Sequence, residues 1–364
     1  MNLNFLKDLL QIKSTIDNPE GIEKVHQRMI QELASKKGLV SFLYSTEASV
    51  VDSLEMAFPG KSNRWITLVT HADTVSYKKK WFDRIDFSQE FIKGQGVADI
   101  KSGTLIAIEA IKEFLKKKKR YYGIRLVSSS CEEIGSPGFH KRFKSFGDES
   151  DFVFGMEPSS PQGNIFSSRN GNKWVKFIQE GESAHSGRAR KGFTNSSHEL
   201  MRKILNLEEY LQSYSGLTMQ TGAFRSGRYF NVVPKTATAR IDFRFLNQES
   251  LKIIDNALIE FMNCKQEVFD FCPALEERKE SQKYADLYQK IIRSTEDRMI
   301  KALHSGGAGD VNHFSSNERT IILDGLGAVG GNLHREDEYI EMKYLETRIK
   351  SLSNFLSEID EISH

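Results

Sequence analysis

Residues 65–70 read Trp-Ile-Thr-Leu-Val-Thr, and this short apolar run is followed directly by His71-Ala72-Asp73. A short apolar run that does not alternate with polar residues is typical of a β-strand buried on both faces by helices. In open α/β sheets, ligands bind beyond the carboxyl ends of the strands. The stretch therefore predicts an α/β fold, and it places a histidine and a carboxylate where a ligand would bind.

Three other runs have the same character: Ile124–Ser128, Asp151–Met156 and Thr320–Asp324. Polar side chains of the kind that bind metals follow these runs: Glu132, Glu133, Glu157 and, after a glycine-rich loop, His334. Helical periodicity separates the runs, with leucine, isoleucine, valine and methionine recurring every three to four residues. The expected helices cover residues 3–12, 21–36, 103–115, 281–300 and 344–358. We therefore expect a mixed sheet flanked by helices, with the metal-binding side chains converging at one edge.

The pattern changes between residues 168 and 279. Alternating strands and amphipathic helices follow one another there in the order β-α-β-β-α-β, which is typical of an antiparallel sheet with two helices on one face. A chain of 364 residues also exceeds the usual size of a single hydrophobic core. We expect two domains, one discontinuous (residues 1–167 and 280–364) and one inserted (168–279).

Composition excludes several classes of protein. Lysine and arginine number 51 against 49 acidic residues, a net charge of +2, which gives no reason to expect a nucleic-acid-binding protein. The three cysteines form no CxxC pair, so a disulfide framework is not expected and a reducing compartment is favoured. The N-terminal stretch is interrupted by Lys7 and Asp8 and does not resemble a signal peptide, and no apolar run approaches the roughly 20 residues that span a bilayer. We expect a cytoplasmic protein without a membrane-spanning segment.

The polar residues at the predicted strand ends suit a metal centre. Imidazole nitrogens and carboxylate oxygens favour Zn²⁺, with Co²⁺ or Mn²⁺ as substitutes, and the absence of thiolate ligands argues against a structural zinc finger. Two cations about 3.5 to 4 Å apart need a bridging carboxylate and, for each cation, further His and carboxylate ligands. Two histidines and several carboxylates, Asp99 among them, provide that inventory. Asp73 is placed to orient the ring of His71 by accepting its second N–H.

Several motifs occur in an order that resembles a known family: THADTV (70–75), GQGVADIKSG (94–103), SSSCEEIGSPG (128–138), MEPSS (156–160), SAHSG (183–187), NVVP (231–234), GGAGD (306–310) and GLGAVGGNLHREDEY (325–339). They resemble the dinuclear zinc family that contains aminoacylase, acetylornithine deacetylase, succinyl-diaminopimelate desuccinylase and the glutamate carboxypeptidases. The similarity spans essentially the whole chain. It implies a zinc-exopeptidase-like fold with an inserted ferredoxin-like domain that serves as a dimerisation domain and lid.

The resemblance implies a role for each candidate ligand. Asp99 would bridge two Zn²⁺ ions. His71 and Glu157 would complete one metal site. Glu133 and His334 would complete the other.

The resemblance also implies the catalytic groups. Glu132 would be the general base that takes a proton from the metal-bridging water and passes it to the leaving amine. His185 would reach the active site of the other subunit of a homodimer and stabilise the tetrahedral oxyanion. Asn231 would contact substrate, and Gly307 would lie in the loop that faces the carboxylate end of the substrate.

Some departures from the family pattern bear on the substrate. The basic stretch Arg188–Lys191 either favours an acidic substrate or is merely solvated, and residues 271–278 offer no clear equivalent of the arginine that binds the substrate carboxylate in glutamate-releasing members. We expect hydrolysis of an amide bond next to a free carboxylate. The choice between a peptide and an N-acyl amino acid substrate stays open, and a non-catalytic metal-binding relative is the alternative.

Overall fold

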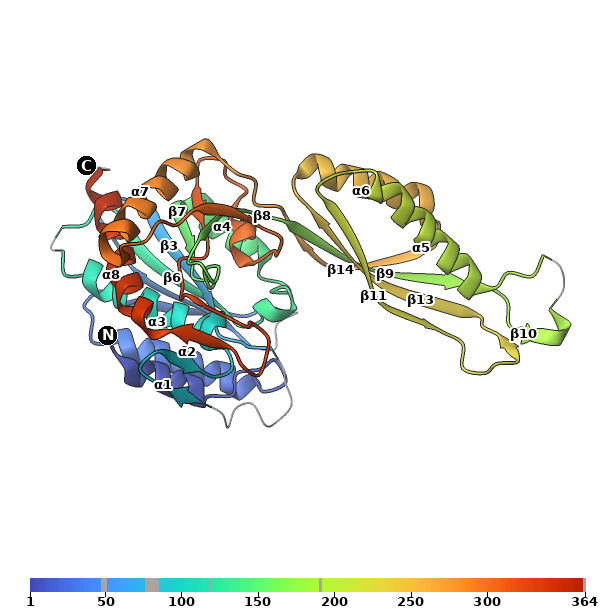
Figure 1. Cartoon of the computed structure of the whole chain (residues 1–364), viewed down its shortest axis with the longest axis horizontal. Coiled ribbons are helices and arrows are strands. Elements are labelled where there is room, and N and C mark those ends of the chain that lie inside the picture. The colour runs from blue at the N-terminus through green and yellow to red at the C-terminus, as the bar shows by residue number, and fades with distance from the viewer. Residues whose placement is uncertain (47–50, 76–84, 118, 190–191, 363–364) are drawn as a thin grey trace. The chain divides into compact units, whose positions relative to one another are not determined.

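The computed structural model describes residues 1–46, 51–75, 85–117, 119–189 and 192–362. These residues form two compact units (Figure 1). The first unit comprises residues 1–168, 277–304 and 309–364, and the second comprises residues 169–276 and 305–308. The predicted fold class, an α/β domain with a mixed sheet and an inserted α+β domain, is confirmed.

The segment 305–308 belongs to the second unit, whereas the sequence pattern placed it in the larger domain. The Arg169 side chain explains the difference, because its Nε donates to the carbonyl oxygen of Gly307 (2.9 Å) and its Nη2 to that of Ala308 (3.3 Å). The main-chain N–H of Asn170 also donates to the carbonyl oxygen of Ser305 (2.9 Å). These bonds tie the glycine-rich segment to the start of the inserted unit.

The first unit contains a six-stranded sheet in the order β1-β2-β6-β3-β7-β16. The strands are β1 (Val40–Tyr44), β2 (Ser53–Phe58), β3 (Trp65–His71), β6 (Gly123–Ser129), β7 (Ser150–Gly155) and β16 (Ile321–Leu323). The last four, which correspond to the predicted apolar runs, are parallel. Strand β2 pairs antiparallel with β6, and β1 pairs antiparallel with β2. Every residue of β6 is buried, and because successive side chains point to opposite faces, both faces of this strand are covered.

Helices cover this sheet: α1 (Leu3–Gln11), α2 (Pro19–Leu33), α3 (Ser102–Phe114), α4 (His140–Glu149), α7 (Lys279–Glu296) and α8 (Met342–Ile362). Helix α8 packs against α3 and α7, and Phe355 on α8 meets Phe154 on β7 with a ring-centroid separation of 5.0 Å. None of the described helices combines the length and the hydrophobicity that a membrane-spanning segment requires. Cys131, Cys264 and Cys272 all lie in described segments, and none of the three forms a disulfide.

A second, smaller sheet of the first unit has the order β17-β18-β5-β4. Its strands are β4 (Asp86–Phe87), β5 (Phe91–Lys93), β17 (Gly330–Gly331) and β18 (Tyr339–Glu341). Strand β18 pairs antiparallel with both β17 and β5. This sheet therefore brings the loop 332–338 next to the turn that follows β5, although more than 200 residues separate them in the sequence.

The second unit has a four-stranded antiparallel sheet in the order β11-β13-β9-β14. The strands are β9 (Gly171–Glu180), β11 (Leu217–Ser226), β13 (Thr236–Phe245) and β14 (Lys265–Cys272). Helices α5 (Ser196–Gln212) and α6 (Gln248–Phe261) pack together on this sheet (Figure 1). Alternate residues of β13, from Ala237 to Phe245, are buried, as expected for a sheet with helices on one face. In this unit the short strand β10 (Ala184–His185) also pairs with β12 (Val232–Val233). Strand β8 (Ile165–Arg169) pairs with β15 (Ala302–Ser305), and most residues of this pair belong to the first unit.

Candidate metal centre

The candidate ligands come from strand ends and from two turns of the first unit. His71 ends β3, Glu133 lies on the short helix η2 (Glu132–Ile134) just after β6, and Glu157 follows β7. Asp99 lies on η1 (Val97–Lys101), and His334 lies in the loop between β17 and β18. The parallel order of β6, β3 and β7 brings the first three to one edge of the sheet, as the sequence pattern predicts.

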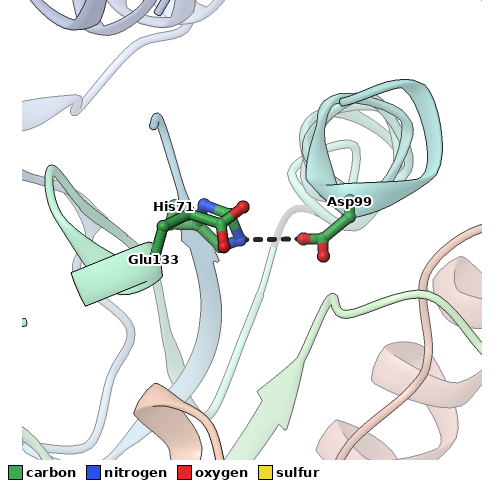
Figure 2. Close-up of side chains that lie close together, drawn as sticks. All are labelled: His71, Asp99 and Glu133. Atoms are coloured by element: carbon green, nitrogen blue, oxygen red, sulfur yellow. Dashed lines mark hydrogen bonds and ion pairs between the residues drawn. The ribbon is translucent and has the colours of Figure 1, made fainter. Parts of the chain in front are cut away.

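These side chains meet around the carboxylate of Asp99. His71 Nε2 lies 3.1 Å from Asp99 Oδ1 and 3.7 Å from Glu157 Oε1. On the other side, His334 Nε2 lies 3.2 Å from Asp99 Oδ2 and 3.4 Å from Glu133 Oε2. Figure 2 shows His71, Asp99 and Glu133 pointing toward one another, and ligand atoms of these three residues all lie within 4.8 Å of one another. Each oxygen of Asp99 thus belongs to a separate group of ligand atoms.

The spacing of these atoms fits a pair of metal ions. In a tetrahedral shell with metal–ligand bonds of about 2.0–2.1 Å, neighbouring ligand atoms lie about 3.3 Å apart. The separations of 3.1 to 3.7 Å around His71 and His334 bracket that value. The donors are nitrogen and oxygen only, which suits zinc and similar divalent cations. The five residues therefore fit two cations that share Asp99.

The negative charge of the cluster also favours bound cations. Burial raises the pKa of Glu132 to about 8 and that of Glu133 to about 10, with neighbouring carboxylates adding to both shifts. Burial likewise raises the pKa of Glu157. Among the residues that the structure describes, no lysine or arginine forms an ion pair with these three carboxylates. Divalent cations would compensate this buried negative charge.

The histidines and the acidic residues of the cluster shift the pKa values of one another. Although burial acts in the opposite direction, hydrogen bonds from His334 and His71 hold the pKa of Asp99 below its usual range. Burial also opposes protonation of His71, but Asp73 and Asp99 raise the pKa of this imidazole well above its ordinary value. In the absence of metal, protonated histidines therefore balance part of the charge of Asp99.

Asp73 connects His71 to the turn that carries the two glutamates. Its Oδ1 accepts from the main-chain N–H of Glu132 (3.1 Å), and its Oδ2 accepts from that of Glu133 (3.0 Å). His71 Nδ1 lies 3.2 Å from Asp73 Oδ1 and 2.9 Å from the main-chain oxygen of Asp73. The contact expected between Asp73 and the His71 ring is present, and Asp73 also fixes η2, which the sequence pattern did not indicate.

Two further buried acids lie beside the cluster. Asp310 accepts from the hydroxyl groups of Ser129 (2.5 Å) and Ser136 (2.6 Å) and contributes to the raised pKa of Glu132. Glu338 accepts hydrogen bonds from the turn that carries Asp99. No sequence pattern singled out Glu338, because the stretch REDEY contains three acidic residues that composition does not distinguish.

The remaining candidate residues belong to the second unit, and their roles stay predictions. His185 is exposed on β10, and Asn231 is exposed before β12. The main-chain N–H of Ser186 donates to the carbonyl oxygen of Asn231 (2.9 Å), so these two motifs are adjacent within this unit. Gly307 lies in the segment held by Arg169. Arg190 and Lys191, half of the basic stretch Arg188–Lys191, lie outside the described residues.

Comparisons with known proteins agree with this arrangement. Residues 67–358 match the model of peptidase family M20/M25/M40. Carboxypeptidase G2 of Pseudomonas sp. (strain RS-16) is 22% identical over an alignment that covers 97% of this chain and 88% of that protein. Succinyl-diaminopimelate desuccinylase of Rickettsia massiliae is 24% identical, with 99% of this chain and all of that protein covered.

Solved structures show the same fold. An M20 family metallo-carboxypeptidase from Sulfolobus solfataricus superposes with a TM-score of 0.81 at 16% identity, covering 97% of this chain and 98% of that one. A dinuclear metal-binding M20 peptidase from Bacillus subtilis superposes with a TM-score of 0.67 at 12% identity, covering 99% of each chain. The family match spans most of the chain and includes all five candidate ligands. The chain therefore belongs to peptidase family M20/M25/M40 and is a hydrolase of the metallopeptidase and amidohydrolase type.

Proposed function

We propose that this protein is a dizinc hydrolase that cleaves an amide bond next to a free carboxylate. The observation that carries the proposal is the position of Asp99, whose two carboxylate oxygens lie 3.1 and 3.2 Å from the Nε2 atoms of two different histidines. A carboxylate shared in this way is the arrangement that a pair of catalytic metal ions requires.

Asp99, His71 and Glu157 would hold one cation, and Asp99, Glu133 and His334 would hold the other. Two Zn²⁺ ions, or Co²⁺ or Mn²⁺ in their place, would polarise the amide carbonyl and lower the pKa of the attacking water. Asp73 orients His71 through the contact to Nδ1. It also fixes the main chain of the turn that carries Glu133.

Glu132 is the proposed general base. Its main-chain N–H is held by Asp73 (3.1 Å), which fixes the start of η2. With no metal bound, burial and the nearby acids Asp310 and Asp99 raise the pKa of its carboxyl group to about 8. Cations bound beside it would lower this pKa toward the ionised form that a general base needs. Glu132 would take a proton from the attacking water and deliver it to the leaving amine.

The second unit would supply the remaining groups. We propose that His185 stabilises the oxyanion in the active site of the other subunit of a homodimer, that Asn231 contacts the substrate, and that Gly307 faces its carboxylate end. The exposure of His185 and the contact between its turn and Asn231 support this assignment. Light scattering on the purified protein tests the dimer, and a fully active monomer would contradict it.

The substrate is either a short peptide or an N-acyl amino acid. Relatives named for each kind of reaction are similar to this chain to nearly the same degree, 22% and 24% identity. Turnover should therefore be measured on dipeptides, N-acetyl and N-succinyl amino acids and acyl-glutamates, with Zn²⁺, Co²⁺ or Mn²⁺ added.

The Glu132→Gln variant tests the mechanism. It should keep about two metal ions per chain and lose at least 100-fold in kcat, because general base catalysis contributes about 10²–10⁴. The matched control is Glu113→Gln, which removes an exposed carboxylate paired with Lys116 and should leave kcat unchanged. Near-normal turnover by Glu132→Gln would remove this residue from the mechanism. Wild-type protein that binds two metal ions and hydrolyses nothing in the panel would favour a binding protein instead.

A further inference from the structure

The small sheet β17-β18-β5-β4 holds two ligand loops together. Strand β5 leads into the turn that carries Asp99, and β17 and β18 flank the loop that carries His334. The main-chain N–H of Gly94 donates to the carbonyl oxygen of Glu338 (3.2 Å), which extends the pairing of β5 with β18 beyond its last residues. Glu338 therefore lies where the two loops meet.

The carboxylate of Glu338 binds the Asp99 turn through three main-chain N–H groups. Its Oε2 accepts from Gly96 (3.0 Å), and its Oε1 accepts from Ala98 (2.7 Å) and from Asp99 itself (3.0 Å). The residue is 2% exposed. The N–H of Val97, between Gly96 and Ala98, donates instead to the carbonyl oxygen of Gly94 (3.1 Å). Main-chain N–H groups of one turn that converge on a point form an anion-binding nest. Glu338 fills this nest from the opposite loop.

The shape of the turn depends on its glycine. Gly96 has φ of +70°, and a Cβ at this position would lie 2.5 Å from Thr74 Cγ2. This backbone conformation lets the N–H of Gly96 point to the same carboxylate as those of Ala98 and Asp99. The buried lysine of the turn, Lys101, donates to the carbonyl oxygen of Ile12 (2.9 Å).

The other loop is held in an uncommon conformation. His334 and Asn332 both have positive φ, +61° and +58°, which non-glycine residues rarely adopt without support from their surroundings. The side chain of Asn332 donates to Asp337 Oδ2 (2.8 Å), and the N–H of Glu338 donates to the carbonyl oxygen of Arg335 (3.2 Å). Glu338 thus closes the His334 loop with its main chain and binds the Asp99 turn with its side chain.

We infer that Glu338 is a positioning residue that sets the distance between Asp99 and His334, and thereby the affinity of the site that these two share with Glu133. The inference rests on the proposed metal centre. Asp99 Oδ2 and His334 Nε2 lie 3.2 Å apart, so a small displacement of either loop would separate two ligands of the same cation. Glu338 itself contacts neither the metal nor the substrate in this role.

The Glu338→Gln variant tests the inference. Glutamine has nearly the same shape, but its amide NH₂ would face main-chain N–H groups that need an acceptor, so at least one of the three bonds is lost. The matched control is Glu341→Gln on β18, which removes a carboxylate paired with Lys343 (3.0 Å). Glu338→Asp, which keeps the charge but shortens the side chain, serves as a second variant that is expected to fold.

Metal affinity is measured without substrate, by titrating the metal-depleted proteins with Zn²⁺ in competition with a chromophoric chelator. Loss of a group that orients metal ligands commonly reduces metal affinity about 10- to 100-fold. We expect a loss of at least tenfold for one of the two zinc ions in Glu338→Gln, a smaller loss in Glu338→Asp and none in Glu341→Gln. Thermal unfolding of the metal-depleted proteins is recorded in parallel.

The possible outcomes separate the two proposals. A lower melting temperature of Glu338→Gln with both zinc affinities within threefold of wild type would overturn the positioning role, because the residue would then be only structural. If Glu338→Gln does not fold, the Glu338→Asp titration decides by the same criterion. Wild-type protein that fails to bind two Zn²⁺ ions would refute the proposed metal centre itself.

Discussion

Replacing Asp73 with asparagine should loosen the turn that carries Glu132 and Glu133. The Asp73 carboxylate accepts from the main-chain N–H groups of both residues (3.1 and 3.0 Å), and asparagine offers one acceptor oxygen in place of two. One buried N–H then faces an amide NH₂. Hydrogen bonds to charged groups contribute about 1.5–3 kcal/mol, and an unsatisfied buried group costs about 1–3 kcal/mol. We expect the Asp73→Asn variant to lose about 2–4 kcal/mol of unfolding free energy.

This loss can be measured as a change in melting temperature. The first unit has roughly 250 residues, and an unfolding entropy of about 2.1 cal/mol/K per residue gives about 0.5 kcal/mol/K. The melting temperature should therefore fall by about 4–8 °C. Because a displacement of about 1 Å of a catalytic group can cost 100-fold in rate, kcat should fall by about two orders of magnitude.

The control for this variant is Asp286→Asn. Asp286 is exposed on α7 and accepts a hydrogen bond from Gln282, so its replacement should change stability by less than about 0.5 kcal/mol. Differential scanning calorimetry and steady-state kinetics are compared for the two variants. An Asp73→Asn protein with a melting temperature within 1 °C of wild type and kcat within threefold would refute the role of Asp73 in holding η2.

Three further predictions concern buried groups of the first unit. Burial lowers the pKa of His26 to about 4, below the value of about 6.5 in an unfolded chain, so the unfolded state binds the proton first as the pH falls. Between pH 6.5 and 4, the free energy of unfolding measured by urea titration should therefore fall by about 3 kcal/mol more in the wild type than in His26→Gln. The same pH dependence of stability in both proteins would contradict this prediction. Gly96→Ala should lower the free energy of unfolding by about 2–5 kcal/mol, because positive φ and a contact with Thr74 are both unfavourable for the added Cβ. In the control Gly38→Ala no atom lies within 4 Å of the added Cβ, so the loss should be only about 1–2 kcal/mol. Equal losses of the two variants in urea unfolding would contradict the steric argument. Burial raises the pKa of the Cys131 thiol to about 12, so iodoacetamide at pH 8 should leave this residue unmodified in the folded protein and alkylate it after denaturation. Mass spectrometry measures the labelling, and rapid labelling of the folded protein would contradict the prediction.

The central strands could be predicted because strands that are buried on both faces have nearly continuous apolar sequences. Strand β3 is buried along nearly its whole length and is apolar apart from two threonines and its terminal histidine, and most of β7 is also buried and apolar. The edge strand β1 is mostly exposed, so its sequence lacks that signal and the strand was not expected. Strands β17 and β18 have only two and three residues, too few for any periodicity to emerge.

Some residues of the candidate site could also be placed from the sequence, and others could not. His71 ends one buried strand and Glu157 lies two residues after another, so the topology of a parallel sheet was enough to place them at one edge. Asp99 and His334 lie in turns whose positions depend on the pairing of β5 with β18. The residue types made both of them candidate ligands, but only the family resemblance implied which metal site each would serve. Glu338 was not found, because its burial depends on three N–H groups from a turn some 240 residues earlier.

Locating the metal ions is the most direct test of the proposed centre. Protein reconstituted with Zn²⁺ can be analysed by elemental mass spectrometry, and its crystals can be measured at wavelengths above and below the zinc absorption edge. We expect two zinc ions per chain, about 3.5–4 Å apart, with the carboxylate of Asp99 between them, His71 and Glu157 on one ion and Glu133 and His334 on the other. Zinc found elsewhere in the chain, or a single ion with Asp99 bound through one oxygen, would contradict a dinuclear centre.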